Sequence, residues 1–210
     1  MPIGRLTTMA ALASALVIAL AGCGSGGDEK TAPPLTPPPG YEVVADAPAG
    51  FAIALPEQWV QLPLYNLKLF EDAAARVSTG DPQLADVLFT AETLVGRAQL
   101  FVLNPADKGA TSVNLIAAEA GGDKSLDVAA KNATDELARL GATGITQQGA
   151  SVAGGPAIEA TFNLDVRTEK GTRPVATTQF YMLRDEMSFV LTFTGAGPEV
   201  DTIAQSLRIR

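Results

Sequence analysis

The sequence contains no histidine and only one cysteine among its 210 residues. Histidine titrates nearest to neutral pH, and it is the commonest general base and the commonest metal ligand. Its absence therefore excludes a large share of enzyme mechanisms. A single cysteine cannot form an internal disulfide, so the folded part of the chain must be stabilised by packing alone.

Basic residues are also few, because 15 Lys and Arg stand against 23 Asp and Glu and give a formal net charge of -8. Proteins bind nucleic acid mainly through Lys and Arg that neutralise phosphates, so this balance argues against a nucleic-acid partner. Hydrophobic residues make up 47% of the chain, which is enough for a core. The length fits one domain with tails.

Sequence motifs that carry catalytic or metal chemistry are missing. The chain has no G-x-S-x-G or S-x-x-K nucleophile motif, no H-E-x-x-H, no paired C-x-x-C, no P-loop and no EF-hand loop. Two pairs of adjacent carboxylates, Glu71-Asp72 and Asp185-Glu186, are typical of a solvated turn or helix surface. We therefore expect no catalytic residue, no cofactor and no metal site.

The first 22 residues have the organisation of an export signal. They contain positively charged Arg5, then an apolar stretch from residue 9 to residue 21, and they end in small residues before Cys23. The apolar stretch is too short to span a bilayer comfortably. The sequence Leu-Ala-Gly-Cys at residues 20–23 resembles the lipobox of bacterial lipoproteins.

This resemblance implies cleavage between Gly22 and Cys23, a diacylglycerol on the Cys23 thiol, and an acyl group such as palmitate on the new amino terminus. Several acyl chains, at about 0.8 kcal/mol per buried methylene, anchor a protein nearly permanently, whereas one chain binds marginally. We therefore expect the protein on the outer face of the cytoplasmic membrane, with the membrane as a partner through Cys23. The alternative is a free cysteine at the end of an ordinary signal peptide.

A tether is predicted for residues 23–40, because the stretch after Cys23 is rich in Gly, Ser and Pro. Such a composition buries little apolar surface, and its proline-rich half stays extended as a semi-stiff spacer. The globular domain is then expected to span residues 41–210.

The domain sequence alternates between strand and helix periods. Strands are expected over residues 51–55, 98–103, 112–117, 158–166, 173–183 and 187–194. Helices are expected over residues 81–95, 125–140 and 199–206. In the second of these, the apolar positions Leu126, Ala129, Ala133, Leu137 and Leu140 form one stripe. The order of these elements predicts an α+β fold with helices packed on an antiparallel sheet.

Four aromatic side chains are candidates for lining a pocket. Trp59, the only tryptophan, follows a strand and a proline turn, and this position favours a role as a core residue. Core packing is also the preferred interpretation of Phe70, Phe89 and Phe101, although these rings could edge a cavity for an acyl chain.

Three segments of the domain resemble PsbP-like domains. They are residues 50–59, with glycine, an aromatic residue, a strand, proline and tryptophan; the turn at residues 152–157 before a long strand; and the end of the chain from Phe189 to Ile209. The whole resembles the LpqN-type lipoproteins of mycobacteria and their relatives. The resemblance implies a PsbP-like α/β/α sandwich over residues 41–210 and provides no catalytic residues. The alanine-rich, lysine-poor composition is typical of an actinobacterium.

Two classes of function remain open. The first, which we favour, is a non-catalytic module that binds a protein or another cell-envelope partner outside the cytoplasmic membrane. The second is a carrier of a lipid or other apolar ligand. A carrier needs a cavity of several hundred Å³ lined by apolar side chains, whereas a binding module needs a filled core and an exposed patch.

We expect the variant Cys23→Ser to remain an uncleaved precursor without acyl chains, because serine has no thiol to accept the diacylglycerol. Metabolic labelling with palmitate and mass spectrometry of the amino terminus measure both effects. Ser25→Ala, two residues further on, should be processed and labelled normally. Palmitate incorporation into Cys23→Ser would contradict lipidation at this residue.

Overall fold

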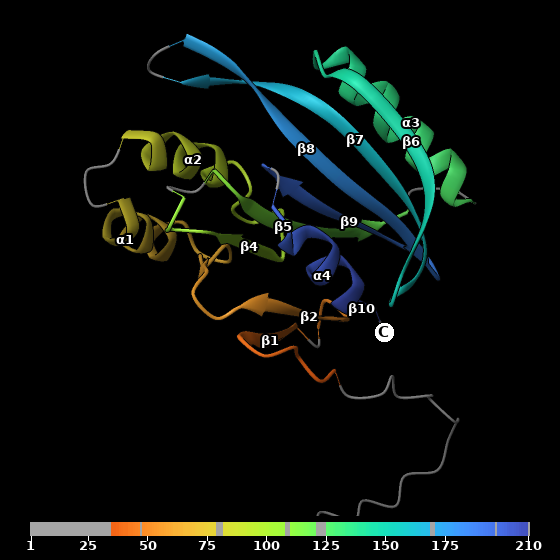
Figure 1. Ribbon diagram of the computed structural model, residues 1–210, viewed down its shortest axis with the longest axis horizontal. Helices are drawn as coiled ribbons and strands as arrows, with labels where there is room; N and C mark the ends of the chain where they lie inside the picture. Colours follow the sequence, from red (N-terminus) through yellow and green to blue (C-terminus); the bar gives the residue numbers. More distant parts are fainter. Residues whose placement is uncertain are drawn as a thin grey trace, which may run out of the picture. The chain divides into compact units, whose positions relative to one another are not determined.

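A seven-stranded antiparallel sheet forms the centre of the part of the chain that the structure describes (Figure 1). The computed structural model describes residues 35–46, 48–78, 82–107, 110–120, 125–168, 171–195 and 197–209, which all belong to one compact unit of residues 32–210. In spatial order the strands of the large sheet are β3 (Val60–Gln61), β4 (Leu100–Leu103), β5 (Ser112–Glu119), β9 (Met187–Thr194), β8 (Gly171–Arg184), β7 (Gly155–Thr168) and β6 (Thr143–Val152).

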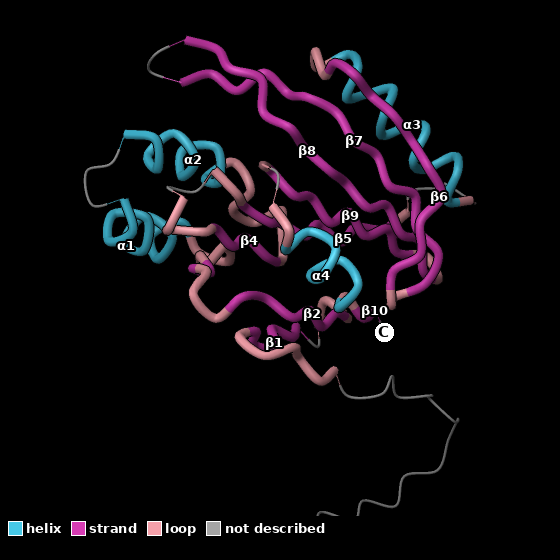
Figure 2. Tube along the Cα trace, in the orientation of Figure 1, coloured by secondary structure: helices cyan, strands magenta, loops and turns pink. Residues whose placement is uncertain are grey.

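A small three-stranded sheet and four helices complete the described unit. The small sheet has the order β1 (Tyr41–Asp46), β2 (Phe51–Pro56) and β10 (Arg208–Ile209). The helices are α1 (Leu67–Ser78), α2 (Pro82–Glu92), α3 (Leu126–Arg139) and α4 (Glu199–Ser206). Figure 2 shows α1 and α2 beside β4 and α3 beside β6.

The main core lies on one face of the large sheet. Strand β9 shows how the sequence produces it, since Phe189, Leu191 and Phe193 are buried there and alternate with residues of the other face. The ring of Phe193 contacts the ring of Phe180 edge to face, with centroids 5.9 Å apart. The small sheet and α4 cover this face with the buried residues Phe51, Ile53, Leu55, Ile203, Ala204, Leu207 and Ile209.

The opposite face of the large sheet is covered at its two ends by different helices. At the β4 end, Phe101 and Leu103 pack in a second cluster with α1 and α2, through Phe70, Leu84 and Leu88. At the other end, Ala130 of α3 packs with Ala160 of β7 and Tyr181 of β8. Helices therefore lie on both faces of the sheet, and the predicted α+β class is confirmed.

The sequence prescribes both ends of α3. Ser125 is the N-cap, and its side chain accepts a hydrogen bond from the backbone N–H of Val128. Gly141 follows the helix with φ of 92°, in the left-handed region where glycine has no steric penalty. The chain then reverses directly into β6, so α3 and β6 are neighbours.

The predicted boundaries agree with most of the long elements, but five elements were not predicted, namely α1 and the strands β1, β3, β6 and β10. The helix predicted over residues 81–95 also extends past Glu92, where α2 ends. The residue predicted to start that helix, Asp81, lies outside the described residues. Strand β6 escaped notice because its residues show no apolar alternation: most of them are exposed.

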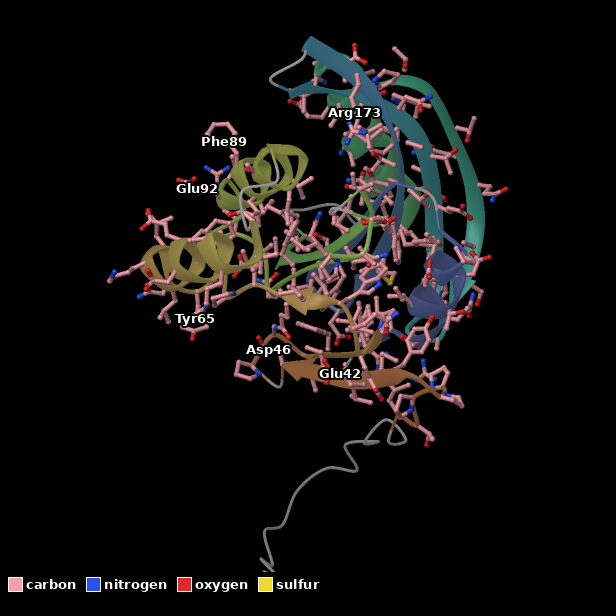
Figure 3. All side chains as sticks on the ribbon, turned by 60° about the vertical axis from the view of Figure 1, so that its left-hand side comes forward. Glu42, Asp46, Tyr65, Phe89, Glu92 and Arg173 are labelled. Carbon is pink, nitrogen blue, oxygen red and sulfur yellow. The ribbon has the colours of Figure 1, made fainter. Side chains whose placement is uncertain are left out.

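Two predictions about individual side chains are wrong. Phe89 was expected in the core, but it is 74% exposed on the outer side of α2 (Figure 3), since Leu84 and Leu88 provide the buried side of that helix. Leu140 was expected on the buried stripe of α3, but it is 67% exposed. The residues of α3 that are fully buried are Ala130 and Thr134, so the helix is rotated relative to the predicted stripe.

Phe193→Ala should lower the free energy of unfolding by about 3–5 kcal/mol, because it removes a fully buried ring and leaves a cavity in the main core. Phe89→Ala is the matched control, since the same truncation at an exposed ring should change stability by less than about 0.5 kcal/mol. Urea unfolding monitored by circular dichroism measures both. Equal losses in the two variants would contradict the assignment of the core.

Candidate binding groove

A groove lies beside α3 on the face of the large sheet opposite to the main core. It consists of two pockets of about 200 and 240 Å³, which adjoin because Ala133, Tyr181 and Val190 line both. We call it the α3 groove and define it by the residues that line these pockets: Ile116, Ala129, Asn132, Ala133, Glu136, Leu137, Gln179, Tyr181, Met182, Ser188, Phe189, Val190 and Thr192.

One wall of the groove is the apolar stripe of α3. Ala129, Ala133 and Leu137 recur at helical spacing, and all three are partly exposed. The sequence predicted these residues on a buried stripe. The helix instead directs Ala130 and Thr134 at the sheet, and the side chain of Thr134 accepts a hydrogen bond of 3.0 Å from Gln147 Nε2. Of the predicted stripe, Leu126 and Ala133 pack against the cluster of Ala130, Ala160 and Tyr181, and Ala129, Ala133 and Leu137 line the groove.

The floor of the groove crosses three strands. Cross-strand pairing aligns Tyr181 of β8 with Val190 of β9, and Val190 with Ile116 of β5. Ile116 also packs against the cluster that α1 and α2 form, so it marks the far side of the floor. These three residues form an apolar row across the sheet.

A polar row lies beside this apolar row. Gln179 of β8 is paired with Thr192 of β9, and Thr192 with Asn114 of β5. Gln179 Nε2 donates a hydrogen bond of 3.1 Å to Thr192 Oγ1, and the Tyr181 hydroxyl donates to Gln179 Oε1. Burial raises the pKa of Tyr181 to about 12, so its hydroxyl remains a donor at neutral pH.

The two rows together can bind a chain that has both apolar and hydrogen-bonding groups. Glu136 and Tyr181 are the titratable residues that line the groove, and the Glu136 carboxylate forms an ion pair with Arg139. Within the described residues there is no group of three or more His, Cys, Asp or Glu that could hold a metal ion.

The residues singled out from the sequence lie elsewhere. Gly22 and Cys23 are outside the described residues. The carboxylates of Glu71 and Asp72 are exposed on α1, where Asp72 pairs with Lys68 at 3.7 Å. Asp185 and Glu186 form the exposed turn between β8 and β9. Neither carboxylate pair lines the groove.

Three of the four aromatic residues weighed from the sequence are buried as predicted. Trp59 is 6% exposed in the main core, and its Nε1 has no hydrogen-bond partner. Phe70 and Phe101 are buried beneath α1 and α2. None of these rings lines the α3 groove.

The sequence analysis did not predict the polar row of Gln179, Thr192 and Asn114. Gln179 and Thr192 stand at alternate positions of strands, where a polar residue is ordinarily explained by solvent exposure. The sequence does show a polar residue on the outward side of each of three strands. Whether these residues line up in a row depends on the register between β5, β9 and β8, which the sequence does not show.

No family model and no curated protein matches this chain. Among solved structures, it is similar to the solution structure of cyanobacterial PsbP (CyanoP) from Synechocystis sp. PCC 6803. The TM-score is 0.43 and the identity 14%, over 89% of this chain and 98% of that chain. The α+β architecture of the described residues thus has a PsbP-like protein among its structural neighbours.

Two other solved structures are similar at the same TM-score of 0.43. One is a crystal structure from Bacteroides thetaiotaomicron VPI-5482, with 13% identity over 76% of this chain and 45% of that chain. The other is the Ran-binding protein Mog1p of Saccharomyces cerevisiae, with 12% identity over 77% of this chain and 80% of that chain. Similarities at this level carry no conclusion about function.

The stability of the fold should decrease as the pH rises from about 10 to about 12. Unfolded tyrosine titrates near 10.0 and folded Tyr181 near 12, so the unfolded chain loses its proton first and is favoured in this range. Tyr181→Phe should reduce this dependence, whereas Tyr65→Phe, at an 80% exposed side chain, should retain it. Urea unfolding at a series of pH values measures the effect. An unchanged slope in Tyr181→Phe would contradict the assignment.

Proposed function

We propose that this protein is a lipid-anchored binding module of the bacterial cell envelope, of the kind that LpqN-type lipoproteins represent. The α3 groove is the observation that carries this proposal. It is the place where an apolar stripe predicted for burial remains partly exposed, next to hydrogen-bonding side chains of the large sheet. A protein or envelope partner that covered it would bury the stripe and pair the polar row.

The proposed location rests on the amino-terminal sequence. The charge, the apolar stretch, the small residues and Cys23 occur in the order of a lipoprotein signal. The proline-rich residues up to position 40 would hold the domain away from the bilayer. Within the described residues no helix is long and apolar enough to cross a membrane, and the anchor that we propose needs none.

The proposed role is binding without catalysis. The groove presents amide, hydroxyl and apolar groups, and the titratable side chains that line it are an ion-paired carboxylate and a protonated phenol. Glu136 and Tyr181 also stand on different elements, α3 and β8. Such a lining suits recognition of a surface better than proton transfer.

The alternative is a carrier of a lipid or another apolar ligand. The apolar row of Ile116, Val190 and Tyr181, with Leu137 on the wall, is the observation that favours it. The two adjoining pockets hold about 200 and 240 Å³, so together they reach the lower part of the usual range of ligand sites, about 300–1,000 Å³. The observation against a carrier is the filled core. Large side chains such as Phe51, Phe193 and Ile203 fill the main core.

A photo-reactive amino acid at Ala133 should cross-link an envelope partner, because this residue lines both pockets. The same group at Ala138, exposed on another side of α3, should give little product. Ala129→Arg, which places a charge in the apolar wall, should reduce the Ala133 product several-fold. Gel mobility and mass spectrometry of cells irradiated with the full-length chain measure these yields. Equal yields from positions 133 and 138, or no effect of Ala129→Arg, would contradict a partner at the groove.

A further inference from the structure

Strand β6 is the last strand of the large sheet on the side opposite to β3, and it is paired with β7. It is ten residues long, and most of its side chains are exposed. Helix α3 contacts β6, β7 and β8, so it lies over a face of the sheet rather than beyond its edge. The edge of β6 is therefore not covered by this helix.

The hairpin between β6 and β7 fixes which backbone groups point outward. A two-residue turn joins Val152 to Gly155, and the pair that flanks such a turn exchanges hydrogen bonds. Pairs then alternate along the ladder, so Ser151, Gly149 and Gln147 direct their N–H and C=O groups away from β7. Ser151 is paired with Pro156, which has no N–H to donate. This agrees with a pair in which Ser151 and Pro156 exchange no hydrogen bonds.

A hydrogen bond at one end of the edge supports the same phase. Gln205 Nε2 of α4 donates to the Ser151 carbonyl oxygen at 2.8 Å, which a carbonyl directed at β7 would not allow. This contact protects the edge at Ser151. Within the described residues, the backbone groups of Gly149 and Gln147 have no such partner outside β6 and β7.

The register of β6 and β7 shifts between Thr143 and Thr146, and the edge from Gln147 to Gly149 lacks the usual protection against strand pairing. Natural edge strands are commonly shielded by lysine, proline or a covering loop, but residues 143–152 include no charged residue and no proline. The side chain of Gln147 is turned toward α3, where its Nε2 donates to Ala130 O and Thr134 Oγ1. A Cβ added at Gly149 would meet no atom within 4 Å, so the space there is open.

We infer that β6 pairs antiparallel with β6 of a second copy of this chain. The outward backbone groups specify the register between the two β6 strands. Since Ser151 is protected by Gln205, Gly149 and Gln147 are the residues whose backbone groups can pair with the second copy. A two-fold axis at Gln148 sets Gln147 of each copy opposite Gly149 of the other, and each of these pairs exchanges both backbone hydrogen bonds. The two large sheets become continuous.

A second copy fits this edge better than a charged peptide. Along β6 no side chain carries a charge, so two identical strands set no like charges opposite each other, and an acidic or basic segment finds no opposite charge on the strand. The pairing also uses the edge of the sheet and leaves the α3 groove to its partner. The inference is therefore independent of the proposed function.

The dimer should be weak. A few backbone hydrogen bonds bury much less than the roughly 1,600 Å² of a standard interface, and the two copies repel each other because Asp and Glu outnumber Lys and Arg in the chain. Sedimentation velocity over a wide range of concentrations can measure such an equilibrium. The sample is the chain from residue 24, which contains the whole compact unit of residues 32–210 and lacks the single cysteine, so that no disulfide can join two copies.

Gly149→Pro removes the outward N–H without removing a bond to β7, and it should weaken the dimer by about tenfold or more. Gly149→Ala adds a Cβ into open space and keeps the N–H, so it should dimerise like the unchanged chain. Thermal unfolding of each variant monitors folding. If Gly149→Pro does not fold, amide hydrogen exchange of the unchanged chain tests the same interface. The amides of Gly149 and Gln147 should then exchange more slowly as the protein concentration rises.

Three results would overturn the inference. The first is a chain that stays monomeric at every concentration. The second is a dimer that a folded Gly149→Pro leaves at full strength. The third is a dimer in which the Gly149 amide exchanges as fast as in the monomer, since that dimer would use another surface.

Discussion

The rest of the structure depends on the burial of one face of the large sheet. Side chains alternate along a strand, so the strands that direct Phe189, Leu191 and Phe193 into the main core must direct Val190 and Thr192 to the opposite face. The small sheet and α4 seal the first face. The helices on the second face cover its two ends, and the α3 groove is the part of that face between them that α3 borders without covering.

Much of the fold follows from the sequence because alternation is a strong local signal. The long strands β7, β8 and β9, the helix α4 and the capped helix α3 all agree with their predicted positions to within a few residues. Strand β6 was missed for the same reason that makes it of interest, since an exposed edge strand has no buried face to impose a pattern. The exposure of Phe89 was equally hidden, because helical spacing shows which residues share a face but not which face the sheet will contact.

The groove was less predictable than the fold. Its wall consists of residues that the sequence assigns to a buried stripe. Helix α3 is rotated relative to that prediction, so that Ala130 packs on the sheet and Thr134 accepts a hydrogen bond from Gln147. The floor of the groove requires the register of three strands, which no local pattern contains. The kind of site stays a prediction from the sequence, because a chain without histidine, and without a recognisable catalytic motif, has more means for recognition than for chemistry. The proposed lipidation of Cys23 would place that recognition at the membrane.

The central claim is that the α3 groove is an open surface that binds a partner, and not the mouth of a lipid-filled cavity. Native mass spectrometry of residues 24–210, produced in the parent organism or a close relative and compared with the denatured mass, tests it most directly. The account predicts a native mass equal to the mass of the polypeptide, because the main core is filled by its own side chains. A reproducible additional mass that matches a lipid would contradict it and identify a carrier.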